Sequence, residues 1–345
     1  MRNTLLLFGL ALAISAPCSR AQVTLSGGKG NLRIHDAGNV YPGTLVLNMV
    51  YSGYGVKTKS GSFGEDHTLN TSLTLGLSER FEWFGHFVPY QDDQQHIWGP
   101  IGDTRTGLKF SFEPMNRAVQ FGLLGSLFFP TAPNHNVMYE PFTADAYGWG
   151  VTGLVTFDLK NSSGAFPIKS SINFGYRDLD WGDRYFLDRK DLLIAGLDLK
   201  FPIRSSIFYS ELNGEFFFNH TDRVAFHQNL IRFTQGFRFL GPGNLIFDLA
   251  ADIELGRYVP TEKERALAGR RGRPFLKDYA DWKILIGVSY RTTLFRHLSR
   301  AERLQKEQRQ REDDKMETIR SKREKVAKEL EELRKKLEQE KDEEP

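Results

Sequence analysis

Ionisable side chains recur at every second position along several apolar stretches of this 345-residue chain. In 244–255, Asp248, Asp252 and Glu254 share one set of alternate positions, and the other set is entirely apolar. The same spacing places eighteen ionisable residues on one face: Glu82, His86, Arg105, Lys109, Asp158, Lys169, Arg177, Asp198, Lys200, Glu211, Glu215, Arg232, Arg238, Asp248, Asp252, Glu254, Lys283 and Arg291. Such a face could bind water, form ion pairs or orient a charged solute.

Nine of these residues are basic and eight are acidic, and their signs alternate along part of the chain. Glu211 and Glu215 are followed by Arg232 and Arg238, then by the three acids of 244–255 and by two basic residues. Two interpretations are open. The charges line a water-filled pore whose transverse field orients small polar or zwitterionic solutes, or they form a salt-bridged interior.

Catalytic and metal-binding patterns are weak. The sequence contains neither Gly-x-Ser-x-Gly nor His-Glu-x-x-His, so an enzyme ranks third among the function classes. Asp178, Asp180 and Asp183 could hold calcium, but they lack EF-hand spacing and are better explained as a solvated acidic loop. We expect no catalytic residue, no metal and no cofactor.

Alternation with period two is the pattern of a β-strand whose faces meet different environments. It predicts twelve strands, near 44–52, 69–77, 81–88, 104–112, 118–129, 147–159, 168–177, 190–201, 207–218, 230–239, 244–255 and 282–291. Short turns such as 78–80 alternate with long loops such as 53–68 and 256–281. These features predict a single antiparallel transmembrane β-barrel with both termini in the periplasm.

The first 21 residues have the composition of a secretory signal peptide, with Arg2, an apolar run and Ser19-Arg20-Ala21 as a cleavage site. Cys18, the only cysteine, would be removed with it; a lipoprotein signal is disfavoured because Pro17 precedes that cysteine. Residues 22–42 are polar and contain several glycines, which fits either a periplasmic lead-in or a small plug in the lumen.

Residues 298–345 differ sharply from the barrel expected at 43–297, because fifteen basic and fifteen acidic residues occur there without glycine or aromatics. Glu324 with Lys328 and Glu331 with Lys335 have the helix-stabilising spacing of four. Val326, Leu330, Leu333 and Leu337 form a short heptad seam. The segment is predicted to be a long charged C-terminal α-helix, either in a coiled coil or solvated alone.

Three motifs carry a family resemblance. They are Gly102-Asp103-Thr104-Arg105 with Gly107-Leu108-Lys109, the hairpin 76–82, and Phe121–Gly125 running toward Pro130-Thr131. Over about 42–295 the chain resembles Gram-negative porin-like barrels and is similar to outer-membrane transporters of the phenol-degradation meta-pathway type. The resemblance implies an outer-membrane location and a transport role but names no solute.

The sequence therefore predicts a passive channel for small polar solutes. The alternative is a structural anchor whose periplasmic helix acts as a strut or a partner-binding rod. Expected partners are outer-membrane lipid, lipopolysaccharide through the basic loop 257–277, and a periplasmic protein or a second copy through the helix. A net charge of only +3 gives no support for nucleic acid.

Overall fold

The computed structural model describes residues 22–57, 63–92, 99–112, 118–133, 143, 145–159, 167–182, 191–203, 205–218, 229–256 and 280–295. The predicted signal peptide, the predicted charged helix and the basic loop 257–277 lie outside these residues. No helix among the described residues is long and apolar enough to cross a membrane.

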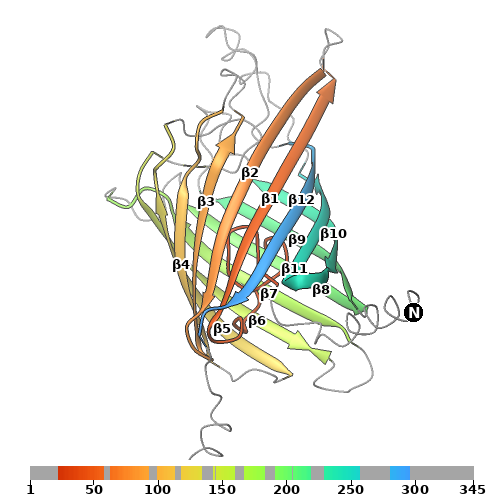
Figure 1. The fold of residues 1–345 in the computed structure, drawn as a ribbon. Helices are drawn as coiled ribbons and strands as arrows, with labels where there is room; N and C mark the ends of the chain where they lie inside the picture. The colour runs from red at the N-terminus through yellow and green to blue at the C-terminus, as the bar shows by residue number, and fades with distance from the viewer. Residues whose placement is uncertain are drawn as a thin grey trace, which may run out of the picture. The chain divides into compact units, whose positions relative to one another are not determined.

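Twelve antiparallel strands form one closed barrel (Figure 1). The first strand, β1, closes the barrel against the last, β12, with Thr44 opposite Thr293. The sequence prediction of a twelve-stranded barrel is confirmed. The strands are β1 (Thr44–Lys57), β2 (Phe63–Gly76), β3 (Phe81–Gln91), β4 (Thr104–Ser111), β5 (Val119–Phe129), β6 (Gly148–Asp158), β7 (Lys169–Asp178), β8 (Leu192–Ile203), β9 (Ser206–Phe217), β10 (Leu230–Leu240), β11 (Leu245–Glu254) and β12 (Trp282–Thr293).

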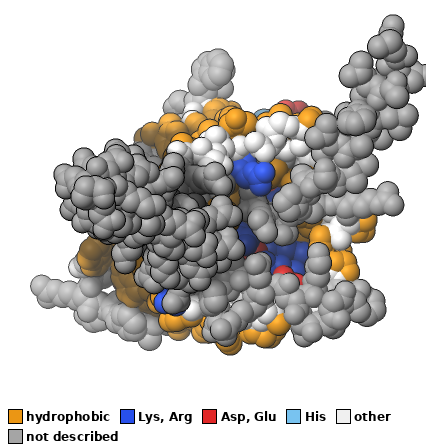
Figure 2. All heavy atoms as spheres, turned by 60° about the horizontal axis from the view of Figure 1, so that its bottom comes forward, with side chains coloured by type: hydrophobic (Ala, Val, Ile, Leu, Met, Phe, Trp, Pro, Cys, Tyr) orange, Lys and Arg blue, Asp and Glu red, His pale blue; other side chains and the backbone are white. Residues whose placement is uncertain are grey.

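The alternating sequence decides which side chains face out. In β11, Phe247, Leu249 and Ile253 are exposed, whereas Ala250 and Asp252 are buried. The same holds around the barrel, so large apolar side chains cover the outside; Figure 2 shows them along the edge of the view, with charged side chains near its middle. A closed sheet with an apolar outside and a polar inside has the architecture of an outer-membrane β-barrel.

Tight turns join strand pairs at one end of the barrel. The link between β10 and β11 contains a short 3-10 helix (Pro242–Asn244), and Gly243 there has a φ of 67° that favours glycine. The β1–β2, β3–β4, β5–β6, β7–β8, β9–β10 and β11–β12 connections leave from the opposite end. The first strand begins, and the last strand ends, at the end with the tight turns.

Residues 22–43 lie inside the barrel, where the start of the described chain runs as loops enclosed by the strands (Figure 1). Val23 pairs with Lys29 and Gly30 with His35 in single β-bridges. Gly27 and Gly28 have φ values of 84° and 81°, so the tight turn that the first bridge closes needs glycine. We call residues 22–43 the plug, because most of them are buried among inward-facing strand residues.

Candidate functional site: a charged lumen and its plug

All eighteen ionisable residues predicted to line the lumen lie on the inward set of alternate strand positions. Several pair directly with a charged residue on another strand. Lys109 Nζ lies 2.7 Å from Glu82 Oε1, and both side chains are fully buried. Arg177 Nη1 lies 3.3 Å from Glu215 Oε1, and Arg238 Nε donates to Asp248 across 2.9 Å.

One inward carboxylate escaped the sequence prediction. Lys283 Nζ on β12 lies 3.1 Å from Asp66 Oδ2 on β2, and Asp66 is only 1% exposed. The sequence placed the start of this strand near residue 69, whereas β2 begins at Phe63. The alternation continues through Asp66, so a longer strand would have revealed it.

The expected alternation of sign does not extend to β7, β8 and β9. The strand register sets Lys169 opposite Lys200 and Asp198 opposite Glu211, so like charges face each other twice. Directly opposed like charges destabilise a sheet. The sequence indicates alternating signs only from residue 211 onward. In this part of the wall Lys200 Nζ lies 3.6 Å from Asp198 Oδ2, and further groups must compensate.

The plug supplies that compensation. Asp36 binds both lysines: one carboxylate oxygen lies 2.9 Å from Lys169 Nζ and the other contacts Lys200 Nζ. On the acidic pair, Asn31 Nδ2 donates to Asp198 across 2.9 Å. Glu211 accepts backbone N–H groups of plug residues 32, 33 and 34, at 2.8, 3.0 and 3.3 Å. The plug therefore neutralises repulsion that the wall alone would contain.

Further contacts fasten the plug to other parts of the wall. Arg33 donates two hydrogen bonds, of 2.9 and 2.5 Å, to the carboxylate of Asp252 on β11. This bidentate geometry makes arginine–carboxylate pairs strong. Across the lumen, Glu82 of β3 accepts the backbone N–H of Lys29 at 2.8 Å and of Val40 at 2.5 Å. The plug is thus tied to β3, β7, β8, β9 and β11.

Burial changes the protonation of plug groups. Burial, reinforced by the nearby charge of Lys169, lowers the pKa of Lys29 to about 7. For Asp36, burial alone would raise the pKa, but Lys169 and Lys200 outweigh it and hold the pKa of this carboxyl well below its usual range. Asp36 therefore carries its charge at neutral pH.

Sequence reasoning missed Arg33 and Asp36 as site residues. Both lie in a segment without alternation, where no pattern distinguishes a buried ion-pair partner from a solvated charge. The available signal was indirect: a short polar segment with several turn-forming glycines lies directly before the first strand.

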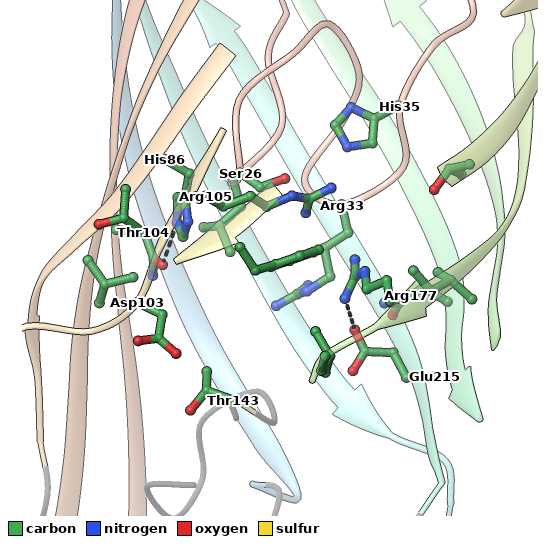
Figure 3. A pocket seen from close by; sticks show the side chains of 18 of the residues that line it. Ser26, Arg33, His35, His86, Asp103, Thr104, Arg105, Thr143, Arg177 and Glu215 are labelled. Carbon is green, nitrogen blue, oxygen red and sulfur yellow. Dashed lines mark hydrogen bonds and ion pairs between the residues drawn. The ribbon is translucent and has the colours of Figure 1, made fainter. Parts of the chain in front are cut away.

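A cavity of about 210 Å³ lies between the plug and the end of the barrel that carries the long connections. Plug residues Leu32, Arg33 and Ile34 form one side of it, and β-strand residues such as Arg105 and Phe128 form the wall. Figure 3 shows Arg33, Arg105 and Arg177 around one space, with His35 on one side and Asp103 and Thr143 on the other.

An acidic cluster lies near the same end of the barrel. Carboxylate oxygens of Asp178, Asp180 and Asp191 lie within 4.8 Å of one another. The sequence had grouped Asp178 and Asp180 with Asp183, which lies outside the described residues. Acidic groups alone do not define a metal site, and the cluster carries no functional argument here.

No protein-family model matches the chain, and no curated protein does. Among solved structures, the chain is similar to the NanC porin, with a TM-score of 0.45 and 10% identity over 70% of this chain and 98% of that one. It is also similar to the translocator domain of autotransporter NalP from Neisseria meningitidis (TM-score 0.35, 10% identity, 72% and 88% covered). The toluene transporter TodX of Pseudomonas putida matches with a TM-score of 0.35 and 11% identity over 73% and 89% of the two chains. At such identities we transfer no ligand.

Replacing Asp36 with asparagine is expected to lower the free energy of unfolding by about 3–5 kcal/mol, because the buried Lys200 and the partly buried Lys169 lose their shared counter-charge. The plug should also become accessible to protease. Urea unfolding of the refolded protein in detergent micelles measures the first effect, and proteolysis followed by mass spectrometry measures the second.

Glu65→Gln is the matched control, because this side chain is 60% exposed and lies 3.2 Å from the ring nitrogen of His67. We expect a change within about 0.5 kcal/mol there. Equal stability of Asp36→Asn and the native protein would contradict a neutralising role for the plug.

Proposed function

We propose that this protein is an outer-membrane transport channel whose lumen is closed by its own N-terminal plug. The outward apolar side chains and the closed hydrogen-bonding of the sheet support the membrane location, because lipid tolerates no unpaired strand edge. Tight turns at the end where β1 starts and β12 ends support periplasmic termini, since outer-membrane barrels keep short turns on that side.

The observation that carries the proposal is the polar attachment of the plug. Asp36, Arg33 and the backbone of residues 32–34 meet charged wall groups that water could solvate equally well once the plug moved. Apolar contacts add to this attachment, since Val23, Leu32 and Ala37 pack with wall residues in three buried clusters, but the buried ion pairs contribute little net stability of their own. A segment held by exchangeable ion pairs, below an open cavity, suits a gate.

Within this proposal the solutes are small and polar. The lumen offers basic and acidic side chains on facing parts of the wall, and their transverse field would orient a dipolar or charged molecule during passage. Selectivity would then depend on the eighteen inward ionisable residues together with Arg33 and Asp36.

A structural anchor is the second candidate function. A filled lumen is consistent with an anchor, just as it is with a gated channel. Its working part would be residues 298–345, acting as a periplasmic strut or binding a periplasmic protein or a second copy. Contact of the basic loop 257–277 with lipopolysaccharide phosphates is compatible with either function.

Removing residues 298–345 separates the two candidates. For a channel, single-channel steps of the refolded protein in a planar bilayer should keep their size and frequency, since wall and gate lie within 22–293. Loss of all steps on tail removal, or no steps in either form, would contradict the channel and favour the anchor.

A further inference from the structure

Arg105 on β4 is a partly buried cation without a carboxylate partner among the described residues. Its Nε has no hydrogen-bond partner there, although the atom is fully shielded from solvent. Its guanidinium lies over aromatic faces: Cζ is 5.6 Å from the ring centre of Phe84 and 5.0 Å from that of Phe128. A guanidinium held by aromatic faces retains N–H donors for an anion.

A second arginine lies over the same ring. Cζ of Arg177 is 5.5 Å from the centre of Phe128, so that one aromatic ring is flanked by two guanidinium groups. Arg177 is already bound to Glu215 at 3.3 Å through Nη1, although its Nε also lacks a hydrogen-bond partner among the described residues, so Arg105 is the member of the pair without a carboxylate. Cation–π contacts hold both groups in place without consuming their N–H donors.

The cavity beside these groups is positively charged and partly apolar. Its described lining contains four arginines, at 33, 105, 177 and 232, against two carboxylates, Asp103 and Glu215. Val88, Phe128 and Ile34 add apolar surface next to the cations. Cationic and apolar side chains around one small cavity favour a ligand that carries both a negative charge and an apolar group.

We propose that this cavity binds a small amphipathic organic anion, a carboxylate carried on a flat apolar group. The carboxylate oxygens accept hydrogen bonds from Arg105, whose planar donors match carboxylate geometry. The apolar group packs against Phe128 and Val88. A volume of about 210 Å³ restricts the ligand to a molecule smaller than those filling typical drug-sized pockets of about 300–1,000 Å³.

Such a ligand would touch the gate. Arg33 and Ile34 belong to the plug and line the cavity, so a bound anion competes with Asp252 for Arg33. Only this last step rests on the proposed channel function; binding itself is a property of the cavity.

Isothermal titration calorimetry of the full-length protein in detergent tests the site with benzoate, its neutral amide benzamide and its cationic amidine benzamidine. We expect benzoate to bind about tenfold more tightly than benzamide, and benzamidine not to bind. This comparison needs no substitution, so it stands even if a variant fails to fold.

Arg105→Met should weaken benzoate binding at least about tenfold, because it removes the charge-assisted hydrogen bonds while keeping a long apolar side chain. Arg80→Met, at an exposed turn position away from the cavity, is the control and should bind normally. Benzamide binding as tightly as benzoate, or unchanged affinity in Arg105→Met, would overturn the proposal.

Inorganic phosphate provides a further comparison. Phosphate that displaces benzoate at equal concentration would overturn the apolar half of the proposal, whereas weak competition supports it. Because binding is measured without a membrane, a failure of benzoate to bind would not contradict the proposed channel function. A protein that binds benzoate but does not conduct would contradict the channel function alone.

Discussion

A variant lacking residues 23–41 is expected to conduct almost continuously, with the open fraction rising about a hundredfold, as for a two-state gate shifted from roughly 1% to roughly 99% open. The deletion removes Arg33, Asp36 and every backbone donor that meets Glu82 and Glu211. Water would then solvate the charged wall along the whole lumen. Planar-bilayer recording measures the open fraction directly.

In that variant, like charges on neighbouring strands are expected to destabilise the barrel wall. Lys169 faces Lys200 and Asp198 faces Glu211, and without the plug these groups lose Asp36, Asn31 and the backbone donors that now lie against them. Heat-modified gel mobility and circular dichroism therefore accompany the recording as checks that the barrel has formed. A folded barrel that stays closed after the deletion would show that something other than the plug occludes it.

The barrel could be predicted from the sequence because its cause is local. Each strand crosses between an apolar exterior and a polar interior, so Leu249 and Asp252 had to fall on opposite sets of alternate positions. Tight turns needed residues such as Gly243, and these mark the connections in the sequence as well. Such features depend on neighbours along the chain.

The plug's contacts depend on neighbours in space. Whether Lys169 lies opposite Lys200 is set by strand register, which follows from turn lengths and bulges rather than from composition. Asp36 meets these lysines from 133 and 164 residues away in the chain. Backbone donors that meet Glu211 have no sequence signature at all. The charged wall of the lumen could therefore be predicted from the sequence, but the contacts by which residues 22–43 fill the lumen could not.

A reversible cross-link between plug and wall is the second large effect that we expect. A Cβ built on Gly196 of β8 would lie 3.5 Å from Cγ1 of Ile34 and 2.1 Å from its Cδ1, an atom that cysteine lacks. Ile34→Cys with Gly196→Cys therefore brings two thiols into disulfide range while removing the clash. Refolded residues 22–345 contain no other cysteine, because the native one is at position 18.

Oxidation should abolish opening events by pinning the middle of the plug to β8, and reduction should restore them. The single substitutions Ile34→Cys and Gly196→Cys serve as controls, and neither should respond to oxidant or reductant. Mass spectrometry of the recorded sample confirms that the disulfide has formed.

The most direct measurement is single-channel recording of this double variant in one membrane, before and after reduction. A gate formed by residues 22–43 predicts silence in the oxidised state and discrete openings after reductant is added. Identical openings in both states, with the disulfide verified, would contradict the claim that plug movement opens the lumen.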